Sequence, residues 1–144
     1  ILEDLIMNEE NYMKKLMLKD IENIFKNSCK SNNLELISYL YDTCPAIDIS
    51  SDNESAFFNA VVWHGNVWHG NDGFCIINYL MEKNPNIDLL VNDQYIMNEM
   101  FEIGNLELIE YIFNLKPNLN YDYEKFLKLT VDNSNLDLIK YIKL

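Results

Sequence analysis

The segment NLELISYL, residues 33–40, decides the fold of this chain because close copies of it return twice. They are NLELIEYI at residues 105–112 and NLDLIKYI at residues 135–142. A weaker copy, FCIINYL, occupies residues 74–80. Counted from the first apolar residue of each copy, the steps along the chain are 40, 32 and 30 residues. Tandem units of this length are typical of helical solenoids, so the sequence predicts an all-α repeat protein.

Each unit is predicted to contain a first helix, a tight turn, a second helix and a loop. Proline cannot continue a helix, and the three prolines fall at one place in the repeat, shortly after the apolar copy, where they end the second helix. Glycine or asparagine closes the first helix. The prolines are Pro45, Pro85 and Pro117. The expected first helices cover residues 21–30, 54–64, 95–103 and 124–132.

The second helix carries an apolar stripe with helical spacing. In residues 105–112 the apolar positions fall on one helical face, and charged residues lie between them. A tyrosine recurs beside this stripe once per repeat, which favours a packing role over a catalytic one. These tyrosines are Tyr39, Tyr79, Tyr111 and Tyr141.

The pattern resembles the ankyrin repeat family. In that family the first helix ends in glycine and a polar residue, the second helix reads L-E-[VIL]-[VI]-x-x-L, and a hairpin loop follows. Residues 105–120, NLELIEYIFNLKPNLN, match the second helix and the loop. The pairs Gly65 and Asn66, and Gly104 and Asn105, match the turn. The resemblance implies an all-α, ankyrin-type helix-turn-helix solenoid with hairpin-like loops between repeats.

The chain departs from the family at the start of the first helix. The family's TPLH is replaced by AFFN at residues 56–59, IMNE at residues 96–99 and KFLK at residues 125–128. The missing Thr and His normally hydrogen-bond the hairpin to the helix. The chain is therefore similar to divergent, asparagine-rich ankyrin proteins of the kind found in amoebal giant viruses and AT-rich protists.

A single domain is expected. The chain has 144 residues, of which 49% are hydrophobic, enough for one continuous core. It begins without methionine and stops inside the last copy, which indicates a piece of a longer protein. Residues 1–19 read as a degenerate earlier repeat. The other repeats are placed at residues 20–51, 52–92, 93–122 and 123–144.

Charge narrows the classes of partner. The formal net charge is -12, and all eleven basic residues are lysine, so the basic stripe that nucleic acid requires is missing. No apolar run is long enough to span a membrane, and three cysteines suit reduced thiols in an intracellular protein. We expect a protein partner, with a basic surface, in the cytoplasm, or in the host-cell cytoplasm if the protein is viral.

The candidate partner-binding residues come from the loops and first helices, which form the usual binding face of ankyrin proteins. The immediate repeat VWHGNVWHGN at residues 62–71 adds two tryptophans, residues that contribute large contact area at small entropic cost. The alternative is that the acids cap helices and that Trp63 closes the first helix. The candidates are Asp52, Trp63, Trp68, Asp93, Tyr95, Tyr121 and Tyr123.

Catalysis, cofactors and metals are not expected. The chain has no GxGxxG, P-loop or GxSxG motif, and both histidines fall in the duplicated segment. His64, His69 and Cys75 could be proposed as a zinc site, but there is no CxxC or HxxxH spacing.

The sequence therefore predicts a protein–protein interaction module, not an enzyme. Two alternatives remain open. The chain could be the recognition part of a larger adaptor or effector, such as a ubiquitin-ligase adaptor, or a structural spacer without a specific partner.

Overall fold

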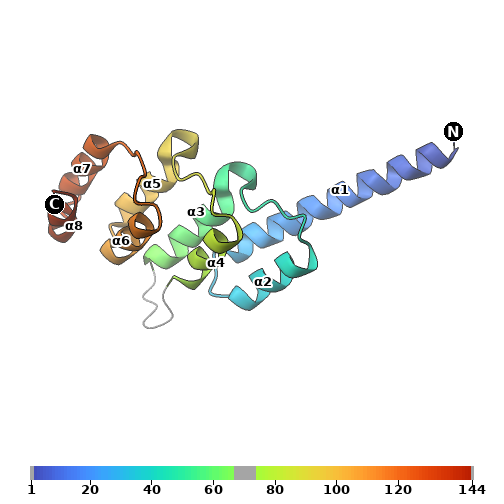
Figure 1. Cartoon of the computed structure of the whole chain (residues 1–144), viewed down its shortest axis with the longest axis horizontal. Helices are drawn as coiled ribbons and strands as arrows, with labels where there is room; N and C mark the ends of the chain where they lie inside the picture. The colour runs from blue at the N-terminus through green and yellow to red at the C-terminus, as the bar shows by residue number, and fades with distance from the viewer. Residues whose placement is uncertain (1, 67–73, 144) are drawn as a thin grey trace.

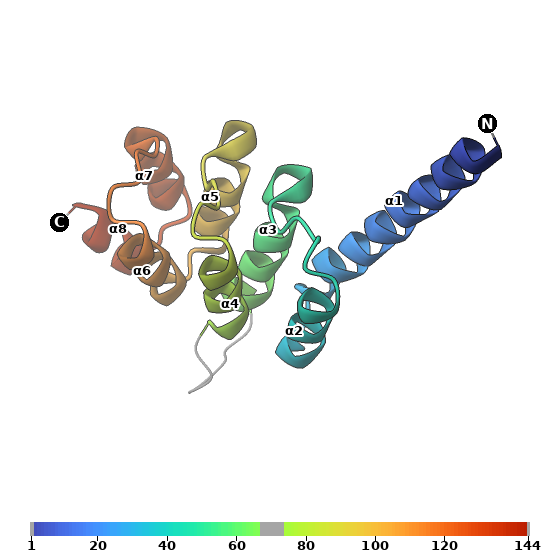
Figure 2. The same cartoon turned by 45° about the vertical axis from the view of Figure 1, so that its right-hand side comes forward.

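The fold is all-helical, as the sequence predicts. The computed structural model describes residues 2–66 and 74–143, and the regular structure within these ranges consists of helices. Consecutive helices pack as pairs, and the pairs stand side by side (Figures 1 and 2). The helices are α1 (Leu2–Ser28), α2 (Leu34–Thr43), α3 (Ser51–Asn66), α4 (Cys75–Lys83), α5 (Val91–Ile103), α6 (Leu106–Leu115), α7 (Tyr123–Asp132) and α8 (Leu136–Lys143).

The first helices of the pairs form one row. Helix α1 packs on α3, α3 on α5 and α5 on α7, while α2, α4 and α6 lie along the other side (Figure 2). Helix α1 is longer than the others, and its N-terminal part projects beyond the stack (Figure 1). Residues 2–28 contain no glycine or proline, so nothing in this stretch interrupts the helix. Residues 2–19 are therefore continuous with the first predicted helix.

Asparagine and proline bound the second helices where the repeat pattern places them. The side-chain Oδ1 atoms of Asn33, Asn105 and Asn135 accept hydrogen bonds from the backbone N–H three residues later. These are N-caps, which satisfy donors that have no partner inside the helix. Helices α2, α4 and α6 end two residues before a proline, which confirms the role of the prolines as stop signals.

Two sets of side-chain hydrogen bonds recur along the stack. In the first, a side chain of a first helix accepts a hydrogen bond from the backbone N–H of the loop after the second helix. The pairs are Glu22 with Asp48 (3.1 Å), Glu54 with Asp88 (3.3 Å) and Gln94 with Asp122 (3.1 Å). In the second, the Nδ2 of an N-cap asparagine donates to the turn carbonyl of the preceding pair. The pairs are Asn105 with Gly65 (3.3 Å) and Asn135 with Gly104 (2.8 Å).

The loops differ from the expected hairpins. No strand pairing occurs in the part of the chain that the structure describes, and the first turns of α3 and α5 are left-handed. Residues 52–54 and 92–94 have φ angles between 51° and 64°. A left-handed conformation costs about 1–2 kcal/mol for most residues, and after glycine it is Asn and Asp that tolerate it best. Four of these six positions are Asn or Asp, which explains why this turn is tolerated here.

The core runs along the stack between the two rows of helices. Phe25, Phe57, Phe101 and Phe126 are fully buried within it, together with apolar residues of the second helices such as Ile37, Leu80 and Leu108. Tyr79, Tyr111 and Tyr141 pack against this core as predicted. The prediction is wrong for Tyr39, which is 65% exposed.

Candidate functional site

Three of the predicted residues gather at the N-terminal ends of α3 and α5, a surface we call the loop-tip face. Asp52 and Asp93 lie in the two left-handed turns and are exposed. The ring of Tyr95 packs on Phe58 with centroids 4.9 Å apart, and its hydroxyl donates to the backbone carbonyl of Asn53. Burial raises the pKa of Tyr95, with Asp52 and Glu54 adding to the effect. Tyr95 therefore joins the two turns into one surface.

The loop-tip face carries exposed carboxylates with little local compensation. The Oδ2 of Asp52 lies 3.6 Å from the Nζ of Lys26, but the Asp52 side chain is 71% exposed, so this ion pair contributes little. Further exposed acids follow in the loops before the first helices. They are Asp48, Asp88 and Asp122.

Tyr121 and Tyr123 lie next to each other before and at the start of α7. Their ring centroids are 6.5 Å apart. Tyr121 stacks on Phe113 at 5.0 Å and belongs largely to the packing, and burial raises its pKa. Tyr123 is 42% exposed, and its hydroxyl donates to the Ile142 carbonyl at 3.4 Å. Of this pair, Tyr123 is the one that offers surface to a partner.

The tryptophan candidates do not join the loop-tip face. Trp63 is half-buried against the core near the C-terminal end of α3, eleven positions from Asp52 in the same helix. The regular part of α3 between them, residues 55–63, rises roughly 12 Å at 1.5 Å per residue. Trp68 lies outside the described residues. The buried His64 meets the ring of Phe74 edge-on at 5.6 Å.

Neither a metal centre nor a membrane span emerges from the described part of the chain. No group of three His, Cys, Asp or Glu side chains among the described residues could hold a metal ion, and His69 of the hypothetical zinc site lies outside them. Among the helices of residues 2–66 and 74–143, none combines the length and the apolarity that crossing a bilayer requires.

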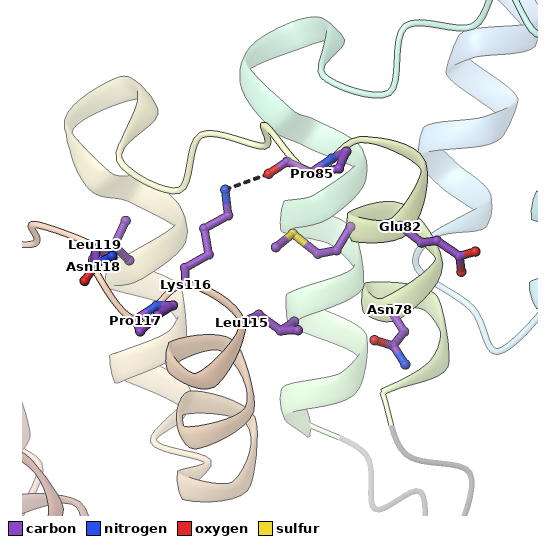
Figure 3. Close-up of a pocket in the computed structure, with 9 residues that line it drawn as sticks. Asn78, Glu82, Pro85, Leu115, Lys116, Pro117, Asn118 and Leu119 are labelled. Carbon is purple, nitrogen blue, oxygen red and sulfur yellow. Dashed lines mark hydrogen bonds between the residues drawn. The ribbon is translucent and has the colours of Figure 1, made fainter.

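A second surface feature, not predicted from the sequence, lies between α4 and the loop that follows α6. It is an open groove of about 730 Å³, which we call the α4–α6 groove (Figure 3). Lys116 forms one wall, because its Nζ reaches across to donate to the carbonyls of Pro85 at 3.1 Å and Ile87 at 2.7 Å. The remaining lining residues are Asn78, Met81, Glu82, Leu115, Pro117, Asn118 and Leu119.

Comparison of equivalent positions explains why the groove forms here. In the register of the prolines, Met81 stands where the neighbouring repeats have Tyr41 and Phe113, and Leu115 stands where the preceding repeat has Lys83. At the preceding junction, the Nζ of Lys83 lies 6.0 Å and 5.5 Å from the ring centroids of Tyr41 and Tyr79. At that junction the Lys83 side chain and the two tyrosine rings fill the space. The equivalent space at the next junction stays open beside Met81.

The signal for the groove was present in the sequence. When the copies are aligned on their prolines, Met81 replaces the aromatic residue of the neighbouring repeats, and Leu115 replaces the lysine of the preceding repeat. The orientation of the Lys116 side chain could not be predicted from the sequence, because it depends on backbone carbonyls of the preceding repeat.

The thiol of Cys29 can be used to test how tightly the first helix pair, α1 and α2, is packed. Its side chain is fully buried, its Sγ donates to the Phe25 carbonyl at 3.3 Å, and burial raises the pKa of the thiol from 9.0 to about 12. Because the thiolate is the reactive form, we expect alkylation of native protein at pH 8 to be slower by on the order of a thousandfold than for a free thiol. A Cys44→Ser, Cys75→Ser variant isolates the reaction, with the denatured protein as control.

The same shift predicts how stability depends on alkaline pH. The unfolded thiol loses its proton near pH 9, whereas the folded thiol keeps it until about pH 12, so folded Cys29 binds more protons in this window. Its contribution to the free energy of unfolding is fully present below pH 9 and is lost as the pH rises toward 12. Urea melts at pH 8 and pH 10.5 measure the loss, and rapid alkylation of native Cys29 would contradict both expectations.

Known proteins offer no guide to this chain: no protein-family model, curated protein or solved structure matches it.

Proposed function

We propose that this chain is an ankyrin-type repeat module that binds a protein partner through its loop-tip face and first helices. The observation that supports this best is the recurrence of one hydrogen bond in three successive pairs, from a loop N–H to Glu22, Glu54 and Gln94. A bond that repeats with the helix pairs fits a solenoid whose loops are held in line. Solenoids of this kind present an extended surface instead of a single enclosed site.

The chemistry of the loop-tip face favours a basic partner. Asp52 and Asp93 are exposed in successive repeats, and the chain as a whole has a net charge of -12. Charges of one sign steer an oppositely charged surface into contact, with an association rate that falls as salt rises. The exposed ring of Tyr123 adds contact area at the edge of the same row of loops.

Replacing both turn acids should weaken the complex. We expect an Asp52→Asn, Asp93→Asn variant to bind its partner from cell lysate more weakly than the unmodified chain, by up to about thirtyfold, since exposed charge pairs contribute up to roughly 1 kcal/mol each. Asparagine tolerates the left-handed turn as well as aspartate, so the fold should survive. The measurement is affinity capture with mass spectrometry at low and physiological salt.

The matched control changes the same number of charges elsewhere. Glu35 and Glu107 are exposed on the second helices, so Glu35→Gln, Glu107→Gln should leave capture unchanged. Equal loss from both variants would indicate a non-specific charge effect. Capture that neither variant reduces would count against the loop-tip face, and absence of any specific partner would favour the structural spacer. A captured ubiquitin-ligase component or other effector would favour the adaptor alternative.

A further inference from the structure

We propose that the α4–α6 groove is a second docking surface, which takes an extended segment of a partner protein carrying one large aliphatic side chain next to lysine or arginine. This inference rests on the proposed function, since it names a further contact surface of the same binding module. It uses none of the residues of the loop-tip face.

The floor of the groove suits an aliphatic side chain. Met81, Leu115 and Pro85 are among its lining residues, and Pro85 lies above Leu115 in Figure 3. Leu115 is 40% exposed, whereas Leu80 and Leu108 of the second helices are fully buried. Methionine is flexible and polarisable, and it adapts to bound apolar groups of different shape. Covering these side chains would remove apolar surface from water, which is the main favourable term in such contacts.

The charges around the groove suit a basic neighbour to that side chain. Lys116 is a lining cation, but its ammonium already donates to two carbonyls. The Glu82 carboxylate lies on the outer rim and points away from Lys116 (Figure 3), so it is accessible to an incoming cation. Glu82 therefore offers an exposed carboxylate at the rim, and the net charge of -12 also favours a basic segment.

Polar groups on the groove can bind the backbone of an extended segment. The Oδ1 of Asn78 accepts the hydroxyl of Tyr111, which orients this amide at the groove wall. Asn118 stands on the opposite side. Side-chain amides both donate and accept, so the two can pair with main-chain groups of a bound peptide.

The test uses a defined peptide and the complete 144-residue chain, labelled with ¹³C at the methionine and leucine methyl groups. Titration with acetyl-Gly-Lys-Leu-Lys-Gly-amide should shift the methyl signals of Met81 and Leu115 saturably. The same peptide with Ala for Leu, or with Glu for Lys, should bind at least tenfold more weakly. Glu82→Gln should weaken the lysine peptide and reduce its dependence on salt.

Met81→Phe is the decisive variant, because it fills the groove without changing charge. An aromatic residue at this position is compatible with the fold, since Tyr41 and Phe113 occupy it in the neighbouring repeats. We expect Met81→Phe to lower the affinity for the lysine peptide at least tenfold, as measured from the methyl signals of Leu115. Met13→Phe, at a 55% exposed position on α1, is the control and should bind normally.

Three results would overturn the proposal: no saturable shift with the lysine peptide, equal binding of the glutamate peptide, or undiminished binding by Met81→Phe. The Asp52→Asn, Asp93→Asn variant should bind the peptide like the unmodified chain. A failure of the groove therefore leaves the loop-tip result standing, and the reverse also holds.

Discussion

Replacing Phe101 by alanine should lower the free energy of unfolding by about 3–5 kcal/mol, the range for a large aromatic residue removed from a packed core. The side chain is 1% exposed. Its ring stacks on Phe126 with centroids 4.8 Å apart and an interplanar angle of 13°, and it also meets Phe113 at 6.2 Å. The substitution therefore opens a cavity where α5, α6 and α7 meet and removes the aromatic contacts as well. Urea denaturation followed by circular dichroism measures the loss.

The same position in the next repeat provides the control. In the register of the N-cap asparagines, Val131 is equivalent to Phe101, but it is 51% exposed. We expect Val131→Ala to cost no more than about 0.5–1 kcal/mol, because little packing is removed. If the two substitutions cost the same, the stacking of α7 on α5 would be wrong.

Replacing Leu108 by alanine should cost about 2–5 kcal/mol, as for other fully buried leucines. Leu108 is 0% exposed on α6. Its Cδ2 lies only 3.3 Å from the point that a Cβ on Gly65 would occupy, so it packs closely against the C-terminal end of α3. The side chain thus connects the second helix of one pair to the first helix of the pair before it.

Leu36 is the matched control for Leu108. It occupies the equivalent position on α2 in the register of the prolines, but it is 36% exposed, since no earlier pair covers it. We expect Leu36→Ala to cost less than about 1–2 kcal/mol. A Leu108→Ala protein that melts in urea like the unmodified chain would contradict the repeat register on which the fold prediction depends.

The helical elements could be predicted because their signals are local. An asparagine cap followed by an apolar stripe and a proline specifies the second helix within about a dozen residues, and the structure has α2 and α6 where the sequence placed them. The extension of α1 to Leu2 was harder to predict from the sequence. The repeat pattern stops near residue 20, and only the lack of helix breakers upstream indicates that the helix continues.

The candidate site was predictable only in part. Exposed acids in successive loops follow from the repeat, which places Asp52 and Asp93 in equivalent turns. The left-handed conformation of those turns was not predicted, because single Asn and Asp residues favour several turn types. The separation of Trp63 from these acids follows only once Asp52 is known to lie in the left-handed turn of α3 and Trp63 near the C-terminal end of the same helix.

The periodic sequence determined the helical class, the limits of the second helices and the acidic character of the loops, since each depends on residues close together in the chain. The tertiary structure decided which copies bury their apolar positions and which leave them open. Phe101 and Val131 share a position and differ in exposure, as do Leu108 and Leu36, because burial depends on whether another pair packs on that face. The α4–α6 groove has the same origin: Met81 and Leu115 are ordinary residues of their helices, and they line an open space only when the two repeats meet.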